Sequence, residues 1–226
     1  MAVARELVTS GAPSGTVIVT DYQSAGRGRL PGRQWVSAPG ESLMMTLALT
    51  DNEPGPAPLR AGLAVARVLE ETFGLSPSIK WPNDVLVGSR KVCGILCEYT
   101  DPWLFIGVGL NLLQQEFPPD LATPATSVRR EIRPGSDIHG DDDDGIDRDD
   151  VLKSLLETLA DQPEDWALQI NDRLWRCGET VRLTEPGGSI VEGRLIGIDG
   201  RGLLQIDRAG VQSSFAAGEL DGPGST

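Results

Sequence analysis

Histidine and cysteine are scarce in this sequence. One histidine, His139, and three cysteines occur in 226 residues. A structural zinc site needs several such ligands at short spacing, and a hydrolase that works through a histidine base needs that residue in its site, so we expect neither. Cys93 and Cys97 lie four residues apart in an apolar segment, which predicts reduced thiols in the core.

Long hydrophobic runs are absent as well. No apolar segment approaches the roughly 20 residues that span a bilayer, and the start of the chain lacks a charged stretch followed by an apolar one. We therefore expect a cytoplasmic protein that does not bind membranes. Its 39% hydrophobic content is enough for a sizeable core.

Positive charge is in short supply: 20 Lys and Arg against 33 Asp and Glu give a formal net charge of −13. Affinity for a phosphate backbone depends mainly on basic patches, so we do not expect DNA as a partner. Much of the acidity lies in residues 137–150, which include the run Asp141 to Asp144. This stretch has no apolar periodicity, which predicts a solvated acidic loop without a metal, although His139 lies beside it.

Apolar spacing in the first 176 residues predicts an α+β fold. β-branched and apolar runs predict strands at residues 16–20, 42–49, 78–81 continuing into 85–87, 91–99 and 103–112. Helical spacing predicts helices at residues 2–10, 59–73, 151–160 and 164–175. Turn residues between successive strands favour a mixed or antiparallel sheet packed with helices over a doubly wound sheet.

The last fifty residues differ in character. Gly-containing turns separate four short predicted strands, at residues 179–183, 190–198, 202–207 and 211–215. This spacing predicts a small β-barrel. We therefore expect one domain at residues 1–176, with the acidic loop inserted in it, and a second domain at residues 177–226.

The segment at residues 21–35, here called the basic loop, joins two predicted strands. Three glycines and three arginines fall within eight of its residues, namely Gly26, Arg27, Gly28, Arg29, Gly32 and Arg33. Glycines let the backbone approach an anion closely, and arginines supply forked donors with a fixed charge. The loop therefore predicts a phosphate or carboxylate ligand, while its composition leaves an ordinary surface loop equally open.

Polar residues interrupt three apolar strands. The segment 80–84, Lys-Trp-Pro-Asn-Asp, breaks a β-rich region, although Asn83 and Asp84 could simply cap a turn. Lys91 enters an apolar strand, where a lysine usually meets an anion; the alternative is an edge lysine that prevents aggregation. Asn111 lies in a Gly-rich apolar strand, where a structural hydrogen bond is the alternative to a binding role.

Together these segments resemble the catalytic domain of bacterial biotin protein ligases, of the monofunctional type without a DNA-binding domain. The motifs lie between residues 21 and 112: the Gly-Arg-Gly-Arg loop with a following Gly-Arg-x-Trp, then Lys-Trp-Pro-Asn-Asp, Lys-x-x-Gly-Ile-Leu and Gly-x-Gly-x-Asn-Leu. The resemblance implies a class II synthetase-like catalytic domain followed by a small SH3-like C-terminal barrel.

The resemblance also implies an activity. Biotin and ATP, with Mg²⁺, would give biotinyl-5′-AMP, and biotin would then pass to a lysine of the biotin carboxyl carrier protein of a carboxylase. The alternatives are a non-catalytic sensor of biotin or biotinyl-adenylate and a lipoate-type protein ligase. Family members include monomers and homodimers, and both states stay open.

Individual residues receive roles through the same resemblance. Lys91 and Arg27 would be catalytic, with Lys91 stabilising developing charge in both steps. Biotin would contact Gln23, Gly26, Arg27, Lys91 and Gly94. ATP or the adenylate would contact Arg27, Arg29, Arg33, Trp35, Lys80, Asn83, Asp84 and Asn111, with Trp35 packed on adenine. Asn83 and Asp84 would lie near Mg²⁺.

The sequence departs from the family pattern in two places. Family members carry a Ser-Thr-Asn-like segment before the first helix, and its hydroxyls contact the biotin ring. This chain begins with Met1-Ala2-Val3, inside or just after that position, so we expect the segment upstream of Met1. The basic loop is one residue longer than the common spacing, at Leu30-Pro31-Gly32.

Overall fold

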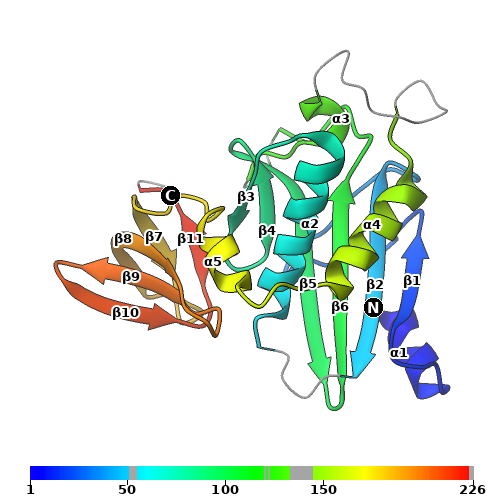
Figure 1. Cartoon of the computed structure of the whole chain (residues 1–226), viewed down its shortest axis with the longest axis horizontal. Helices are drawn as coiled ribbons and strands as arrows, with labels where there is room; N and C mark the ends of the chain where they lie inside the picture. Colours follow the sequence, from blue (N-terminus) through cyan, green and yellow to red (C-terminus); the bar gives the residue numbers. More distant parts are fainter. Residues whose placement is uncertain (51–54, 120, 122, 133–144, 224–226) are drawn as a thin grey trace.

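The computed structural model describes residues 1–50, 55–119, 121, 123–132 and 145–223. Six strands form a large sheet in the order β1-β2-β6-β5-β4-β3 (Figure 1). They are β1 (Thr16–Thr20), β2 (Ser42–Thr50), β3 (Pro77–Lys80), β4 (Asp84–Val87), β5 (Arg90–Thr100) and β6 (Trp103–Asn111). Each neighbouring pair is antiparallel, which confirms the predicted α+β class with an antiparallel sheet.

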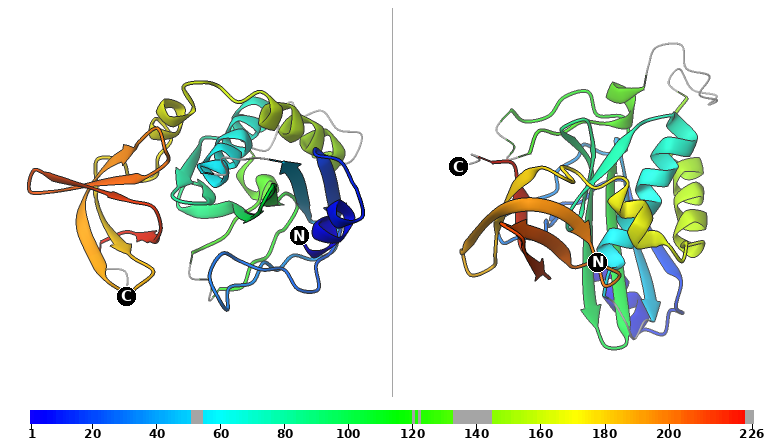
Figure 2. Two further views of the ribbon diagram at one scale, coloured as in Figure 1. Left: turned by 90° about the horizontal axis from the view of Figure 1, so that it is seen from below. Right: turned by 60° about the vertical axis from the view of Figure 1, so that its left-hand side comes forward.

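Two helices, α2 (Ala57–Phe73) and α4 (Arg148–Ala160), cover one face of the large sheet (Figures 1 and 2). α2 is apolar along its inner side, and Leu63, Val65 and Leu69 are fully buried in the core. Gly74 ends α2 in the left-handed conformation (φ 61°) that glycine adopts without strain. On the other face, the short helix α1 (Ala2–Thr9) packs beside β1 and β2.

A small sheet stands beside the β3 edge of the large one (Figures 1 and 2). Its antiparallel order is β10-β9-β8-β7-β11. The strands are β7 (Thr180–Thr184), β8 (Ile190–Ile198), β9 (Leu204–Arg208), β10 (Val211–Phe215) and β11 (Glu219–Asp221). Val181, Leu183 and Leu195 are fully buried and supply its core. Four strands match the predicted ones closely, and β11, only three residues long, was missed.

The predicted strand at residues 78–87 is wrong as one continuous element. Pro82 cannot donate to a ladder, and the chain reverses there, so β3 and β4 pair as a hairpin. The predicted helix at 164–175 is also too long, because α5 comprises only Trp166–Asn171. The chain leaves the helix to pair with β3: Ile79 N–H donates to Arg173 O (2.8 Å), and Trp175 N–H donates to Ile79 O (3.0 Å).

The predicted acidic loop extends too far at its C-terminal end. α4 begins at Arg148, and the Asp147 carboxylate accepts hydrogen bonds from the backbone N–H groups of Asp149 (2.7 Å) and Asp150 (3.0 Å). An aspartate cap and acidic residues in the first turn stabilise a helix N-terminus, so these three aspartates start a helix. Residues 133–144, with His139 and the aspartate run, lie outside the described residues. A four-residue helix, α3 (Val128–Glu131), was not predicted.

The cysteines behave as predicted. Cys93 is buried, Cys97 is half-buried, and both are free. Burial raises the pKa of the Cys97 thiol to about 12, so the thiol stays protonated at neutral pH. Across the described part of the chain, none of the helices combines the length and apolarity needed to cross a bilayer.

Candidate active site

Glycines form a flat floor on the face of the large sheet opposite α2. Gly94 of β5 pairs with Gly109 of β6, and Gly107 lies two residues before Gly109, so all three face the same side. A side-chain carbon would lie 3.1 Å from the Trp35 ring at Gly94 and 2.7 Å from it at Gly109. The missing side chains therefore make room for the Trp35 indole. Gly109 was not named as a site residue, although Gly-x-Gly in a strand is a signal for such a surface.

Lys91 lies across this floor. Its Nζ is 2.7 Å from Asp84 Oδ1 and 5.9 Å from the centre of the Trp35 ring, and both partners of the ion pair are largely buried. The backbone of Lys91 is bonded on its outer side too, since its N–H donates to Pro124 O (2.7 Å) and its carbonyl accepts from Thr126 N–H (2.9 Å). Lys91 is therefore not on a free sheet edge, which the alternative of an aggregation-preventing edge lysine requires. The anion that it meets in this structure is the Asp84 carboxylate.

The basic loop folds into a narrow hairpin over the floor. Gly28 N–H donates to Arg33 O (2.8 Å), and Trp35 N–H donates to Gly26 O (3.2 Å). A side-chain carbon at Gly26 would lie 2.3 Å from Trp35 O, so only glycine permits this approach. The additional residue in Leu30–Gly32 lies at the tip, where Arg33 is exposed. Gly26 and Gly28 thus place Trp35 on the glycine floor.

The arginines of the basic loop diverge. Arg27 is 65% exposed and forms an ion pair with Glu98 of β5 (3.0 Å), whose second carboxylate oxygen accepts from Arg5 of α1 (2.8 Å). Glu98 lies four residues beyond Gly94 on the same face of β5, about 13 Å away at 3.3 Å per residue. Arg29 instead points to the small sheet and donates to Gly218 O (2.9 Å). The structure therefore brings Arg27 to the floor face but not Arg29. Glu98 was not predicted, because nothing in its local sequence distinguishes it.

Only one side chain of segment 80–84 meets Lys91, and that is Asp84. Lys80 Nζ lies 3.1 Å from Asp221 of β11, and the buried Trp81 donates from Nε1 to Gly202 O (3.1 Å). Asn83 forms two hydrogen bonds with the backbone of Ile95. Its side-chain Nδ2 donates to Ile95 O (3.0 Å), and its backbone carbonyl accepts from Ile95 N–H (2.9 Å). The segment thus links β5, the Lys91 site and the small sheet.

Asn111 is buried in a polar cluster, where it is 4% exposed. Its Nδ2 donates to Thr126 O (2.9 Å), and its Oδ1 accepts from Gln114 Nε2 (3.2 Å). These bonds are of the structural kind that the sequence analysis gave as the alternative to a binding role for Asn111. Gln23, in contrast, is exposed at the start of the basic loop, and a side-chain carbon at Gly26 would lie 2.9 Å from its Oε1.

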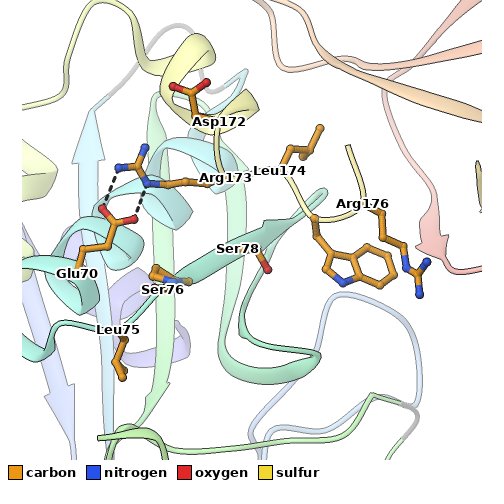
Figure 3. A pocket seen from close by; sticks show the side chains of 10 residues that line it. Glu70, Leu75, Ser76, Ser78, Asp172, Arg173, Leu174 and Arg176 are labelled. Atoms are coloured by element: carbon orange, nitrogen blue, oxygen red, sulfur yellow. Dashed lines mark hydrogen bonds and ion pairs between the residues drawn. The ribbon is translucent and has the colours of Figure 1, made fainter. Parts of the chain in front are cut away.

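Two cavities lie near the junction of the sheets. The larger, of about 540 Å³, lies along the outer side of β3 beside the Glu70–Arg173 ion pair (Figure 3), and none of the predicted site residues lines it. The smaller, of about 220 Å³, lies between Arg29, Asn83, Leu96 and the Ala216–Ala217 segment. This smaller cavity borders the site described above, because Asn83 adjoins Asp84 in the chain.

Comparisons with known proteins identify the family of this chain. Residues 2–111 match the model of the biotin/lipoate A/B protein ligase family, and residues 177–221 match the biotin protein ligase C terminal domain. The chain is 32% identical over 234 residues to the bifunctional ligase/repressor BirA of Bacillus subtilis (strain 168), an alignment that covers 95% of this chain and 68% of that relative. The chain belongs to the biotin protein ligase family.

Another relative and a solved structure carry ligase names alone. The biotin--[acetyl-CoA-carboxylase] ligase of Mycobacterium tuberculosis (strain ATCC 25618 / H37Rv) is 31% identical over 224 residues, covering 91% of this chain and 78% of the relative. The solved structure of the biotin protein ligase from Aquifex aeolicus in complex with biotin and ATP superposes with a TM-score of 0.79 at 29% identity, covering 96% of this chain and 92% of that one.

Proposed function

We propose that this protein joins biotin to ATP as biotinyl-5′-AMP and then transfers the biotin to a lysine of a carboxylase carrier protein. The observation that carries the proposal is a paired lysine, Lys91, lying across a glycine floor under an arginine-containing loop. Relatives named as biotin ligases and a similar structure that holds biotin and ATP support it. We also propose that residues 1–176 form the catalytic domain and residues 177–226 the C-terminal domain.

The glycine floor suits a flat, elongated substrate. We place biotin along β5 between Glu98 and the ammonium of Lys91, which lies over Gly94, a span of about 13 Å for the four residues from Gly94 to Glu98, with its carboxylate at Lys91. Gln23, Gly26 and Arg27 would flank its ring, and Gly94 would lie beneath its chain. Because Trp35 covers Gly94, the indole must move aside for biotin to lie there, and the proposed contact of Trp35 with adenine depends on that movement.

In the first step, a biotin carboxylate oxygen attacks the α-phosphorus of ATP. A P–O bond forms, the bond to the β-phosphate breaks, and pyrophosphate leaves. Lys91 stabilises the negative charge that develops between carboxylate and phosphate, because a fixed cation in a largely buried site acts with little solvent screening. Arg29, Arg33 and Lys80 are assigned to the nucleotide only through the family resemblance, since Lys80 and Arg29 contact the small sheet here.

In the second step, the acceptor lysine amine attacks the acyl carbon of the adenylate. A C–N bond forms, the C–O bond to AMP breaks, and the nitrogen loses a proton to solvent. Lys91 again faces the leaving phosphate. No nucleophile from the enzyme is needed, because both nucleophiles belong to the substrates.

Asp84 and Asn83 are the residues that we propose to hold Mg²⁺. Among the described residues, no group of three or more His, Cys, Asp or Glu gathers, but Mg²⁺ typically takes only one or two protein carboxylates and keeps several waters. The Asp84 carboxylate and the oxygen of the Asn83 amide are donors of the kind it prefers. The ion would neutralise charge on the polyphosphate when ATP is bound.

Biotin-dependent exchange of pyrophosphate into ATP, and labelling of a carrier domain, test the proposal. We expect both in the wild type and a loss of at least about a hundredfold in Lys91→Ala, a typical loss for a group that stabilises transition-state charge. The matched control is Lys153→Ala, which removes an exposed lysine of α4. Unimpaired Lys91→Ala excludes the role of Lys91. Exchange with lipoate instead of biotin favours the lipoate-type alternative, and binding of biotinyl-adenylate without its formation favours the sensor.

A further inference from the structure

The small sheet holds the basic loop through one hydrogen bond. Arg29 lies in the basic loop, and its guanidinium donates to the carbonyl of Gly218, 189 residues further along the chain (2.9 Å). Gly218 itself has little freedom, since a side-chain carbon there would lie 2.7 Å from Leu183 and 2.9 Å from Thr184 O of β7. The acceptor of Arg29 is therefore fixed to the small sheet and not to the loop.

The small sheet is in turn fastened to the large one by an ion pair at its edge strand. Lys80, the last residue of β3, lies 3.1 Å from Asp221 of β11, and its side chain is only 14% exposed. Its Nζ also lies 5.2 Å from the centre of the Trp175 ring. Trp81, the next residue, donates to Gly202 O in the connection between β8 and β9. A shielded ammonium needs a counter-charge, so Lys80 and Asp221 fix the position of β11 relative to β3.

We propose that Lys80 and Asp221 are positioning residues: they set the small sheet so that Gly218 holds Arg29 and keeps the basic loop over the glycine floor. Asp221 is joined to Gly218 by only two intervening residues, so a shift of β11 moves the carbonyl that Arg29 uses. The cavity of 220 Å³ between Arg29, Asn83 and Ala216–Ala217 lies at this junction. Lys80 thus acts on the nucleotide side of the site through the small sheet rather than by contact with ATP.

Trypsin digestion of the unliganded full chain tests the loop contact without reference to catalysis. Trypsin cuts after arginine, and cleavage of a closed loop follows the fraction of time that it is open. Asp221→Asn removes an ion pair that is partly exposed on one side, so we expect cleavage after Arg27 and Arg29 to accelerate about two- to fivefold. Mass spectrometry identifies the cut bonds.

The matched control is Glu219→Gln, which removes a negative charge from the same strand, two residues before Asp221. We expect its cleavage rate to equal that of the wild type. Equal rates in Asp221→Asn and Glu219→Gln overturn the proposal.

A second variant, Arg29→Met, tests the loop contact if Asp221→Asn is not folded at the temperature of the assay. This variant keeps the Lys80–Asp221 pair and removes only the donor to Gly218. We expect faster cleavage after Arg27 and Arg33, and an unchanged rate overturns the proposal.

The consequence for ATP rests on the proposed function. In pyrophosphate exchange we expect Asp221→Asn to raise the KM for ATP about two- to fivefold with kcat nearly unchanged, because the loop is displaced while Lys91 stays in place. An equal fall in kcat with constant KM contradicts a positioning role. If the wild type shows no exchange, the proposed function fails, and the trypsin result still decides whether the small sheet holds the loop.

Discussion

Replacing Gly109 with alanine adds a methyl group to the glycine floor under Trp35. That carbon would lie 2.7 Å from Cε2 and 2.8 Å from Cζ2 of the indole. Ordinary carbon contacts begin at 3.4 Å, so the ring and the strand must separate by about 0.7 Å. Overpacking of this kind costs roughly 1–3 kcal/mol. We expect Gly109→Ala to lower the free energy of unfolding by an amount in that range.

Urea unfolding in two backgrounds isolates the contact. In a Trp35→Ala protein the methyl group meets no ring, so the cost of Gly109→Ala should vanish or become a gain of roughly 0.5 kcal/mol, since alanine is favoured over glycine in strands. Gly200→Ala is the control, because no heavy atom lies within 4 Å of the added carbon there. The same cost in both backgrounds would refute the reasoning.

Biotin binding gives a second measurement on the same variant. If biotin occupies the floor, the added methyl group lies under the substrate, and calorimetric titration should give an affinity at least about tenfold weaker, equivalent to 1.4 kcal/mol. If Gly109→Ala binds biotin with wild-type affinity, biotin does not lie on the glycine floor. That result would not contradict the contact between Trp35 and Gly109.

Two further predictions concern buried groups. Asn111→Ala should lower the free energy of unfolding by about 1–3 kcal/mol, measured with urea, because Thr126 O and Gln114 Nε2 lose a buried partner; a cost below 0.5 kcal/mol would contradict a structural role. Burial raises the pKa of the Cys97 thiol from 9.0 to about 12, because the folded protein favours the protonated thiol. The contribution of Cys97 to the free energy of unfolding is therefore fully present below pH 9 and is lost as the pH rises towards 12. Stability should therefore fall in that window, and less steeply in Cys97→Ala; identical slopes would contradict this.

Local patterns were sufficient to predict most of the large sheet and α2. Strands such as Thr16–Thr20 contain β-branched residues between clear turn signals, and α2 has both an apolar inner side and Gly74 at its end. The errors occurred where distant residues decide. α5 is short because residues 173–175 pair with β3, and β11 forms because β7 is beside it. No local spacing encodes either pairing.

The site was predictable to a similar degree. Lys91, Asp84, Gly94 and Trp35 are among the predicted site residues, and the structure brings them together on one face of the sheet. Neighbours in one motif nevertheless point in different directions: Asp84 meets Lys91, while Lys80 meets Asp221, 141 residues away. Such partners depend on the arrangement of the two sheets, which a motif does not contain.

Carboxylates of the protein itself balance the cations of the site. Lys91 is 26% exposed and pairs with Asp84, and Arg27 pairs with Glu98. A largely buried ammonium without a counter-charge is costly, so Asp84 stabilises the charged form of Lys91. Any anionic substrate must then compete with these carboxylates, and its affinity is the difference between the new ion pairs and the old ones. Because the exposed Arg27–Glu98 pair is worth little, this competition is concentrated at the Lys91–Asp84 pair.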